Sequence, residues 1–229
     1  MQNRQFPEME EDDRLKEYLD RCAFINKDGE TCEFTTLQKH DLNLVLQKHY
    51  ALLNWQQGSG KTAAVYHRAK YLLKFRKAKN VIILAPAIAT NMTWIPFLTI
   101  NKERFRTIQT AGDLNNIPEG TFLVVSTSML RKLKRGLMHF VKRTSGKLCL
   151  VFDESDEITN PTSQRTRNIL CIFRRLRYKI LDTGTTTRNN IAELYSQFEL
   201  LYNNSVNMIC WSPQVYHENR DHELSLIHI

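Results

Sequence analysis

A glycine-rich segment, Trp55 to Thr62, carries the residue types that a phosphate-binding loop needs. It reads W-Q-Q-G-S-G-K-T and lies between a short apolar run and a long helical pattern. Glycines let successive backbone N–H groups turn toward an anion, a lysine reaches the β- and γ-phosphates of a nucleotide, and a hydroxyl binds Mg²⁺. The widely used form of this loop has glycine where Trp55 stands, and a chance glycine turn before a helix is the alternative interpretation. The residues predicted to bind the nucleotide here are Gly58, Ser59, Gly60, Lys61 and Thr62.

Two adjacent acids follow a second apolar run. The run L-C-L-V-F at Leu148 to Phe152 predicts a buried strand that delivers Asp153 and Glu154 at its end. One carboxylate in such a place holds Mg²⁺ while its neighbour orients and deprotonates the attacking water, which is the division of labour that phosphoryl transfer requires. Adjacent acids on a loop are usually only solvated. Acids that cap a buried strand downstream of a phosphate loop instead favour ATP and Mg²⁺ as ligands.

The elements that must position these groups alternate between strand and helix. Strands are predicted at Tyr50 to Trp55, Val81 to Leu84, Phe122 to Ser126, Leu148 to Phe152 and Tyr178 to Leu181. Helices are predicted at about Thr62 to Arg76, from about Met92, at about Met129 to Val141 and at about Gln164 to Leu176. This alternation predicts an α/β fold with a central, mainly parallel sheet and helices on both faces. Ligands collect at the carboxyl ends of the strands in such sheets, which is where both motifs fall.

One further helix is predicted before the glycine loop. The spacing in L-Q-K-H-D-L-N-L-V-L-Q-K-H-Y places Leu37, Leu44, Val45 and Tyr50 on one helical face. The charged segment Pro7 to Asp13 is typical of a frayed or helical lead-in.

The amino-acid composition limits which binding partners and which cellular location are expected. A net charge of +8 and a pI near 9.3 favour a polyanionic partner, because Lys and Arg release counterions from a phosphate backbone. The five cysteines are an odd number and widely spread, which indicates reduced thiols in an intracellular protein. Cys22, Cys32 and His40 fit no common zinc spacing, so no zinc site is predicted. No apolar stretch approaches the roughly 20 residues that span a bilayer. We therefore expect no membrane contact and a cytoplasmic location, or a nuclear one in a eukaryote.

Several segments together resemble the Swi/Snf-type branch of the superfamily-two helicases. Asp153 to Asp156, D-E-S-D, is similar to the D-E-x-H box, and Leu181 to Asn189, L-D-T-G-T-T-T-R-N, is similar to L-T-G-T-P-x-x-N. Val81 to Leu98 is similar to the family's strand, proline and later Asn-x-x-Trp segment. Leu123 to Leu130 and the N-I-A-E-L run follow in the family's order, so that the resemblance covers about Leu37 to Leu201.

The resemblance implies a three-layer RecA-like P-loop NTPase domain that binds ATP and Mg²⁺. We expect an N-terminal extension at 1–33, the first ATP-binding lobe at 34–212 and a truncated tail at 213–229. Leu224 to Ile229 resembles translated adapter sequence, so we expect the natural chain to continue. The family's second RecA-like lobe, with its arginine finger, is not evident in these residues. Because that arginine contributes about 10³ to 10⁵ in turnover in related systems, this lobe alone should hydrolyse ATP poorly.

Three departures from the family pattern affect function. Asp156 replaces the histidine of the box and Thr186 replaces a proline. His40 and Asp41 stand where the family has an aromatic–glutamine pair that reads adenine, and Asp41 remains a candidate acceptor for the adenine amino group. The resemblance also implies that Thr183, Gly184 and Thr185 couple the nucleotide state to the nucleic-acid groove, although an ordinary strand-end turn is the alternative.

Two basic runs are candidates for contact with a phosphate backbone. From Gly120 to Phe152 there is no acidic residue, and this stretch carries Arg131, Lys132, Lys134 and Arg135. The second run consists of Arg174, Arg175, Arg177 and Lys179. Charge runs are often solvated helix faces, but both runs adjoin segments that touch the nucleic acid in similar proteins. Contacts of this kind position a backbone without reading its sequence.

The function predicted from these features is a double-stranded-DNA translocase or remodelling ATPase, with a strand-separating helicase also admitted and RNA not excluded. A metabolic P-loop NTPase with no nucleic-acid role is the alternative, and stimulation of ATPase activity by DNA separates the two. A degenerate module that only holds nucleotide is disfavoured by the intact Lys61, Thr62, Asp153 and Glu154.

Overall fold

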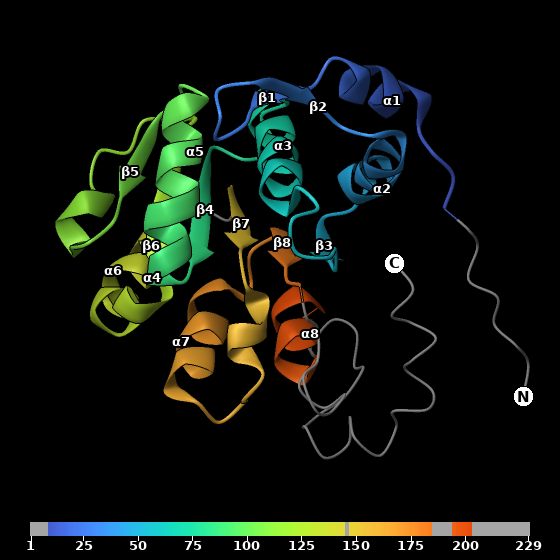
Figure 1. Ribbon diagram of the computed structural model, residues 1–229. Helices are drawn as coiled ribbons and strands as arrows, with labels where there is room; N and C mark the ends of the chain where they lie inside the picture. The colour runs from blue at the N-terminus through green and yellow to red at the C-terminus, as the bar shows by residue number, and fades with distance from the viewer. Residues whose placement is uncertain (1–8, 145–146, 185–193, 203–229) are drawn as a thin grey trace, which may run out of the picture.

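The computed structural model describes residues 9–144, 147–184 and 194–202. Six parallel strands form the central sheet, in the order β3-β8-β7-β4-β6-β5 (Figure 1). The strands are β3 Tyr50–Leu53, β4 Asn80–Ala85, β5 Phe105–Thr107, β6 Phe122–Ser126, β7 Leu148–Phe152 and β8 Tyr178–Asp182. The predicted α/β fold with a mainly parallel central sheet is confirmed.

Helices cover both faces of this sheet. The longer ones are α1 Asp13–Asp20, α2 Thr36–Gln47, α3 Lys61–Lys74, α6 Leu130–Arg143, α7 Gln164–Phe173 and α8 Tyr195–Tyr202. After β4 the chain forms α4 Ala87–Ala89, a π-helical turn η1 Thr90–Trp94 and α5 Ile95–Ile100. Single 3₁₀ turns lie at η2 Ala111–Leu114, η3 Thr127–Met129 and η4 Ser155–Ile158. No helix within the described ranges is both long and apolar enough to cross a membrane.

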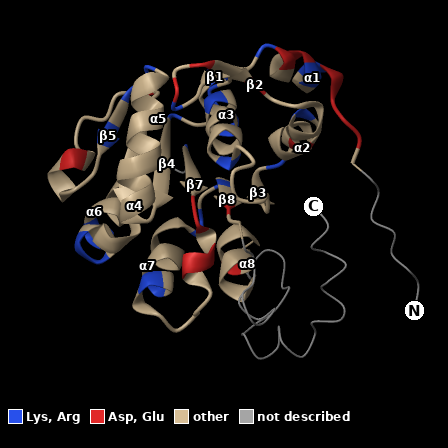
Figure 2. Cartoon of the chain, viewed as in Figure 1, with Lys and Arg blue, Asp and Glu red and all other residues tan. Residues whose placement is uncertain are grey.

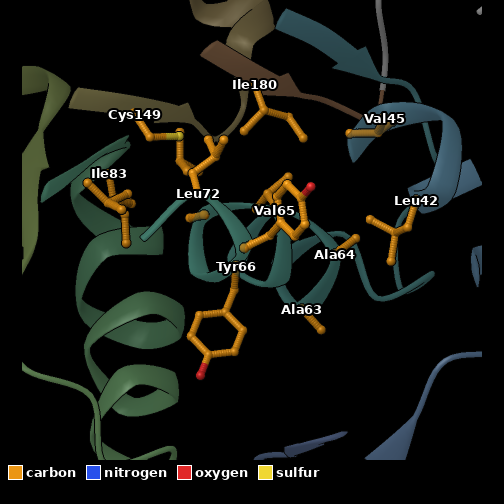
Figure 3. Close-up of a cluster of buried hydrophobic side chains, with 14 of the residues drawn as sticks. Leu42, Val45, Ala63, Ala64, Val65, Tyr66, Leu72, Ile83, Cys149 and Ile180 are labelled. Carbon is orange, nitrogen blue, oxygen red and sulfur yellow. The ribbon is translucent and has the colours of Figure 1, made fainter. Parts of the chain in front are cut away.

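Alternation along the strands builds a separate core on each face. Ile83 and Val151 pack with α1, α2 and α3, whereas Ile82 and Leu150 pack with α6, α7 and α8. Figure 3 shows the first core, where α2 and α3 side chains meet those of β4, β7 and β8. In Figure 1, α7 and α8 lie on the opposite side of the sheet from α1, α2 and α3. Two cores that share one sheet give the expected three layers.

The turn between α2 and β3 is fixed by a buried arginine. Arg68 of α3 is 1% exposed, and its Nη2 donates to the carbonyl oxygens of Lys48 (3.1 Å) and His49 (2.7 Å). A buried guanidinium is costly unless its N–H groups find acceptors, so these bonds hold the start of β3 against α3. The strand that leads into the phosphate loop is therefore held against α3 at its start.

The segment before α2 packs on the same core. Asp12 caps α1 by accepting from Arg14 N and Leu15 N, and a two-stranded hairpin follows, β1 Ala23–Ile25 paired with β2 Thr31–Glu33. Leu19 is 1% exposed and belongs to the core of the α3 face.

The predicted face of α2 is right only at Val45: Leu44 is half-buried, Tyr50 belongs to β3 and Leu37 is exposed. Leu37 is 71% exposed, because α2 begins at Thr36 and turns its first residues toward solvent, while Leu42, Val45 and Leu46 are buried. The predicted helix from about Met92 also begins earlier, at Ala87, and passes through the π turn.

A pair of leucine substitutions tests this arrangement. Leu19→Ala should lower the free energy of unfolding by about 2 to 5 kcal/mol, because it opens a cavity in the core. Leu37→Ala removes the same atoms at an exposed position. Its free energy of unfolding should therefore stay within about 0.5 kcal/mol of that of the parent protein. Urea unfolding followed by circular dichroism measures both, and equal losses would contradict the placement of α1 and α2.

Candidate nucleotide-binding site

The phosphate loop leaves β3 and enters α3 at the carboxyl edge of the sheet. Gly58 and Gly60 have left-handed backbones, with φ of 81° and 84°, which residues with a Cβ rarely adopt. Gly60 is also the N-cap of α3, and no side chain caps this helix. The first N–H groups of α3 are thus not taken by a capping side chain, and the helix dipole adds positive potential there. An anion at this helix end fits both properties.

Lys61 lies folded over the loop. Its Nζ donates to the carbonyl oxygens of Trp55 (3.1 Å) and Gln56 (3.3 Å). A Cβ built on Gly184 would lie 3.5 Å from the same Nζ and 3.9 Å from the backbone N of Gln57. The turn that follows β8 therefore reaches the loop, so that two motifs far apart in the sequence meet at the lysine.

Gln38 ties the start of α2 to the loop, a contact that the sequence did not predict. Its Nε2 donates to the carbonyl oxygen of Ser59 at 2.8 Å, and its Oε1 accepts from Thr35 N at 2.8 Å. The Thr35 hydroxyl oxygen in turn accepts a hydrogen bond from Gln38 N, which completes a capping box. A Cβ on Gly60 would come within 3.2 Å of Gln38 Nε2, which is a second reason for glycine there. The pattern T-x-x-Q was the available signal.

Asp41 contacts Trp55, at the start of the loop segment. Its Oδ2 accepts a hydrogen bond from Trp55 Nε1 at 2.8 Å. Trp55, which departs from the usual glycine of the loop, is thereby anchored to α2. His40 is paired with Glu11, at 2.7 Å between Nδ1 and Oε1. Neither contact tests the predicted role of Asp41 toward adenine, which stays a prediction.

The acid pair lies at the end of β7. This strand pairs with β8, which in turn pairs with β3, the strand that leads into the loop. Asp153 is 8% exposed, its backbone N donates to Leu84 O at 2.9 Å, and its Oδ2 accepts from Trp94 Nε1 at 2.7 Å. Trp94 is fully buried in the π-helical turn, and such turns often occur at functional sites. The tryptophan was part of the Asn-x-x-Trp resemblance, but its bond to Asp153 was not predicted.

Glu154 occupies a strained position. Its backbone is left-handed, with φ of 54° and ψ of 53°, although it carries a full side chain. Burial raises the pKa of Glu154, Asp153 and Asp156 act in the same direction, and Lys61 opposes them. A carboxylate whose pKa is raised toward the working pH is better suited to accept a proton.

The Thr183–Gly184 turn is bonded to the acid box. Thr183 Oγ1 donates to Asp156 Oδ1 at 3.3 Å, and Thr183 N donates to Leu53 O at 3.2 Å. Ser155 Oγ in turn donates to Gln197 Oε1 of α8 at 3.1 Å. Asp156, a departure from the box histidine, thus serves as the acceptor that joins the box to the turn. Thr185, the third predicted coupling residue, lies outside the described residues.

A third acid, Asp182, enters the site from the last position of β8. It stands where the family pattern L-T-G-T-P has leucine, a departure that the sequence analysis missed. Asp182 is 1% exposed, and burial raises its pKa well above the usual range, with Asp153 acting in the same direction. Its position at the end of an apolar predicted strand, like that of Asp153 and Glu154, was the signal in the sequence that could have revealed it.

The basic run on α6 is on the surface. Leu130, Leu133 and Leu137 face inward, which leaves Arg131, Lys132 and Arg135 exposed and Lys134 half-buried. The helix follows β6 after only one 3₁₀ turn, so its first residues lie at the carboxyl edge of the sheet (Figure 2).

The prediction that the second basic run contacts a phosphate backbone is wrong for Lys179. This residue is 2% exposed, and its Nζ donates to Arg174 O (2.8 Å) and Leu200 O (2.6 Å). Burial lowers its pKa to about 8. Lys179 holds α8 against β8 and is not available to a phosphate backbone. Arg174 is half-buried beside Glu199, at 3.5 Å, and Arg177 stacks on Tyr178.

The fold and this arrangement of loop, acid pair and turn define a RecA-like P-loop NTPase lobe. The chain belongs to the family described as type III restriction enzyme, res subunit (ResIII), whose model matches residues 15–188. It is 28% identical over 175 residues to the ATP-dependent helicase FUN30 of Saccharomyces cerevisiae, a match that covers 71% of this chain and 15% of that protein.

Two solved structures share the fold. The SWI2/SNF2 ATPase core of Sulfolobus solfataricus in complex with dsDNA has a TM-score of 0.60 at 16% identity, covering 75% of this chain and 36% of that one. The UvsW helicase from bacteriophage T4 has a TM-score of 0.55 at 14% identity, covering 82% and 64%. The predicted resemblance to superfamily-two, Swi/Snf-type ATPases is confirmed. The chain spans less than two thirds of each of these relatives.

Removing the loop lysine should separate nucleotide binding from folding. Lys61→Ala should weaken ATP binding by about 10- to 100-fold or more, since it removes charge-assisted bonds to phosphate. The thermal unfolding midpoint should change little, because Lys61 bonds only carbonyls of the half-exposed loop. Calorimetric titration with ATP measures the affinity, and Lys74→Ala, an exposed lysine on the same helix, is the control. Unchanged affinity in Lys61→Ala would refute the assignment of the loop.

Proposed function

We propose that this chain is the ATP-binding first lobe of a motor ATPase that moves on double-stranded DNA. The observation that carries the proposal is the meeting of three motifs at neighbouring strand ends: the loop after β3, the acid pair after β7 and the Thr183–Gly184 turn after β8 between them. Motors of this class need these three parts in contact, because the nucleotide state must be passed to the nucleic-acid groove.

The residues present fit a nucleotide with Mg²⁺. The left-handed glycines, the uncapped N-terminus of α3 and Lys61 suit a triphosphate. Thr62 in the first turn of α3 and Asp153 would supply the hard oxygen ligands that Mg²⁺ prefers beside phosphates. When bound, the cation would neutralise charge on the transferring phosphoryl group.

Each residue then has a separate task. Lys61 would exchange its bonds to the loop carbonyls for bonds to phosphate oxygens. Trp94 holds the Asp153 carboxylate in place through its N–H group. Glu154 would orient the attacking water and accept its proton, a role that its raised pKa and exposure support. Thr183 would report the state of the site to the groove through its bond to Asp156.

Double-stranded DNA is proposed as the partner on two grounds: the exposed basic residues of α6 and the similarity to known proteins. The Sulfolobus core was solved with dsDNA, and FUN30 is named as an ATP-dependent helicase. The exposed Arg131, Lys132 and Arg135 lie at the same edge of the sheet as the nucleotide residues. Those residues suit phosphate contacts, which are insensitive to sequence. A second RecA-like lobe in the longer protein would complete both the ATP site and the groove, and this lobe alone would hydrolyse ATP slowly.

The role of Glu154 is tested by a substitution that keeps its shape. In a protein that includes the second lobe, Glu154→Gln should preserve binding of ATP and Mg²⁺ but lower turnover by about 10²- to 10⁴-fold, because the amide cannot accept the proton. Release of inorganic phosphate under single-turnover conditions measures the effect. Hydrolysis that survives within a few-fold would place the base elsewhere.

DNA binding is tested by the salt dependence of affinity. Reversing Arg131, Lys132, Lys134 and Arg135 to Glu should weaken duplex binding and reduce the slope of log K against log salt by about 0.9 per lost phosphate contact. The loss of affinity should be equal for duplexes of unrelated sequence. Fluorescence anisotropy at several salt concentrations measures both quantities.

A matched reversal on the opposite edge is the control for net charge. Lys74, Arg76, Lys77 and Lys147 are exposed and lie where α3 ends and β7 begins, at the amino edge of the sheet. Their reversal should leave the slope nearly unchanged. Equal losses from the two reversals would remove the support for a groove on α6.

A further inference from the structure

Asp182 is brought opposite the acid pair by strand register. β7 and β8 are parallel and pair Phe152 with Leu181, so Asp153 and Asp182 are the next residues on the two strands. On its other side, Asp182 pairs with Leu53, the last residue of the loop strand. Ile180, two residues earlier, packs on the α3 face, and the period of two along a strand puts the Asp182 side chain on that face as well. Asp182 therefore lies between the acid pair and the phosphate loop.

The Asp182 carboxyl group is buried beside a second acid, Asp153. It is 1% exposed, and neither of its oxygens has a hydrogen-bond partner among the described residues. The groups that act on its pKa are all members of the nucleotide site: Asp153 raises it through its charge and through a close approach of the two carboxyl groups, Glu154 raises it, and Lys61 lowers it. A buried acid without donors destabilises a fold, so leucine, which the family pattern has here, would serve packing better.

We propose that Asp182 is a second magnesium-positioning carboxylate, so that this chain holds the cation of its nucleotide between the ends of β7 and β8. The inference rests on the proposed function, because the cation would arrive with the nucleotide. No group of three or more His, Cys, Asp or Glu in the described part of the chain is arranged to hold a metal by itself. Mg²⁺ in nucleotide sites is commonly bound by one or two carboxylates together with phosphates, and Asp153 with Asp182 makes two.

The Mg²⁺ dependence of nucleotide binding tests this role without any turnover. A fluorescent, non-hydrolysable ATP analogue is titrated into the chain in EDTA and then at rising Mg²⁺, for the parent protein, Asp182→Asn and Asp182→Leu. The Mg²⁺ concentration that half-saturates the gain in affinity should rise about 10- to 100-fold in both variants, as it does when residues that support a metal are removed. Affinity in EDTA should be about the same in the parent and in both variants, since without the cation Asp182 has no part in binding the phosphates.

Glu103→Gln is the matched control. Glu103 is half-buried and accepts from Tyr66 and Lys70 on the far side of α3, and the amide keeps an acceptor there. Its half-saturating Mg²⁺ concentration should equal that of the parent. Thermal unfolding in EDTA completes the comparison: Asp182→Leu should be at least as stable as the parent, whereas a purely structural acid would give a lower midpoint and an unchanged Mg²⁺ dependence.

A change of metal preference gives a second measurement. Asp182→Cys should restore the gain in nucleotide affinity with Cd²⁺ better than with Mg²⁺, because a thiolate prefers the softer ion. Glu103→Cys should show no such preference. If the parent binds no nucleotide under any condition, the proposed function fails. If the parent binds with a clear Mg²⁺ dependence that the Asp182 variants share, only the role of Asp182 is overturned.

Discussion

Three neighbouring parallel strands, β3, β8 and β7, end at the same level, and the chemistry of this lobe depends on that register. The hydrogen-bond ladder continues one residue past the strands: Thr183 N donates to Leu53 O, and Asp153 N donates to Leu84 of β4. The first residues after β7 and β8 are therefore positioned by the sheet itself. A loop, an acid pair and a threonine turn, which are far apart in the chain, consequently face one another with little freedom to drift.

This convergence gathers buried carboxyl groups around one lysine. Asp153, Asp156 and Asp182 are all nearly inaccessible to water, and the cost of burying them is met differently in each case. An indole N–H satisfies Asp153 and a threonine hydroxyl satisfies Asp156, whereas Asp182 has no donor among the described residues. Lys61 meanwhile bonds to loop carbonyls. A site in this condition favours a ligand that carries both phosphate and a divalent cation, because each would relieve one of these imbalances.

Sequence reasoning succeeded where the signal was local. The limits of β6 and β7 were predicted to the residue, because each is an apolar run between polar turns. The three-residue strands β1, β2 and β5 were missed because they are too short to show a period. Leu37 was assigned to the buried face from spacing alone, although the helix starts one residue earlier and exposes it.

Within the site, residue types were predictable but their partners were not. Gly58 to Thr62 and the acid pair carry recognisable patterns. Trp94 reaches Asp153 across 59 residues and Gln38 reaches Ser59 across 21, and no local pattern encodes such contacts. Lys179 was assigned to a basic surface because it stands in a run of basic residues. It is buried because α8 packs over it, and the sequence of the run does not reveal that packing.

The central claim is that nucleotide is held where these three strands end. Backbone amide resonances of the isotope-labelled chain, followed by NMR during titration with ATP and Mg²⁺, test it most directly. The account predicts that the largest shifts fall on Gly58 to Thr62, on Asp153 and Glu154, and on Thr183 and Gly184, with little change in the β1–β2 hairpin or at the C-terminal end of α6. Shifts concentrated in those distant segments, with the three strand ends unaffected, would contradict it.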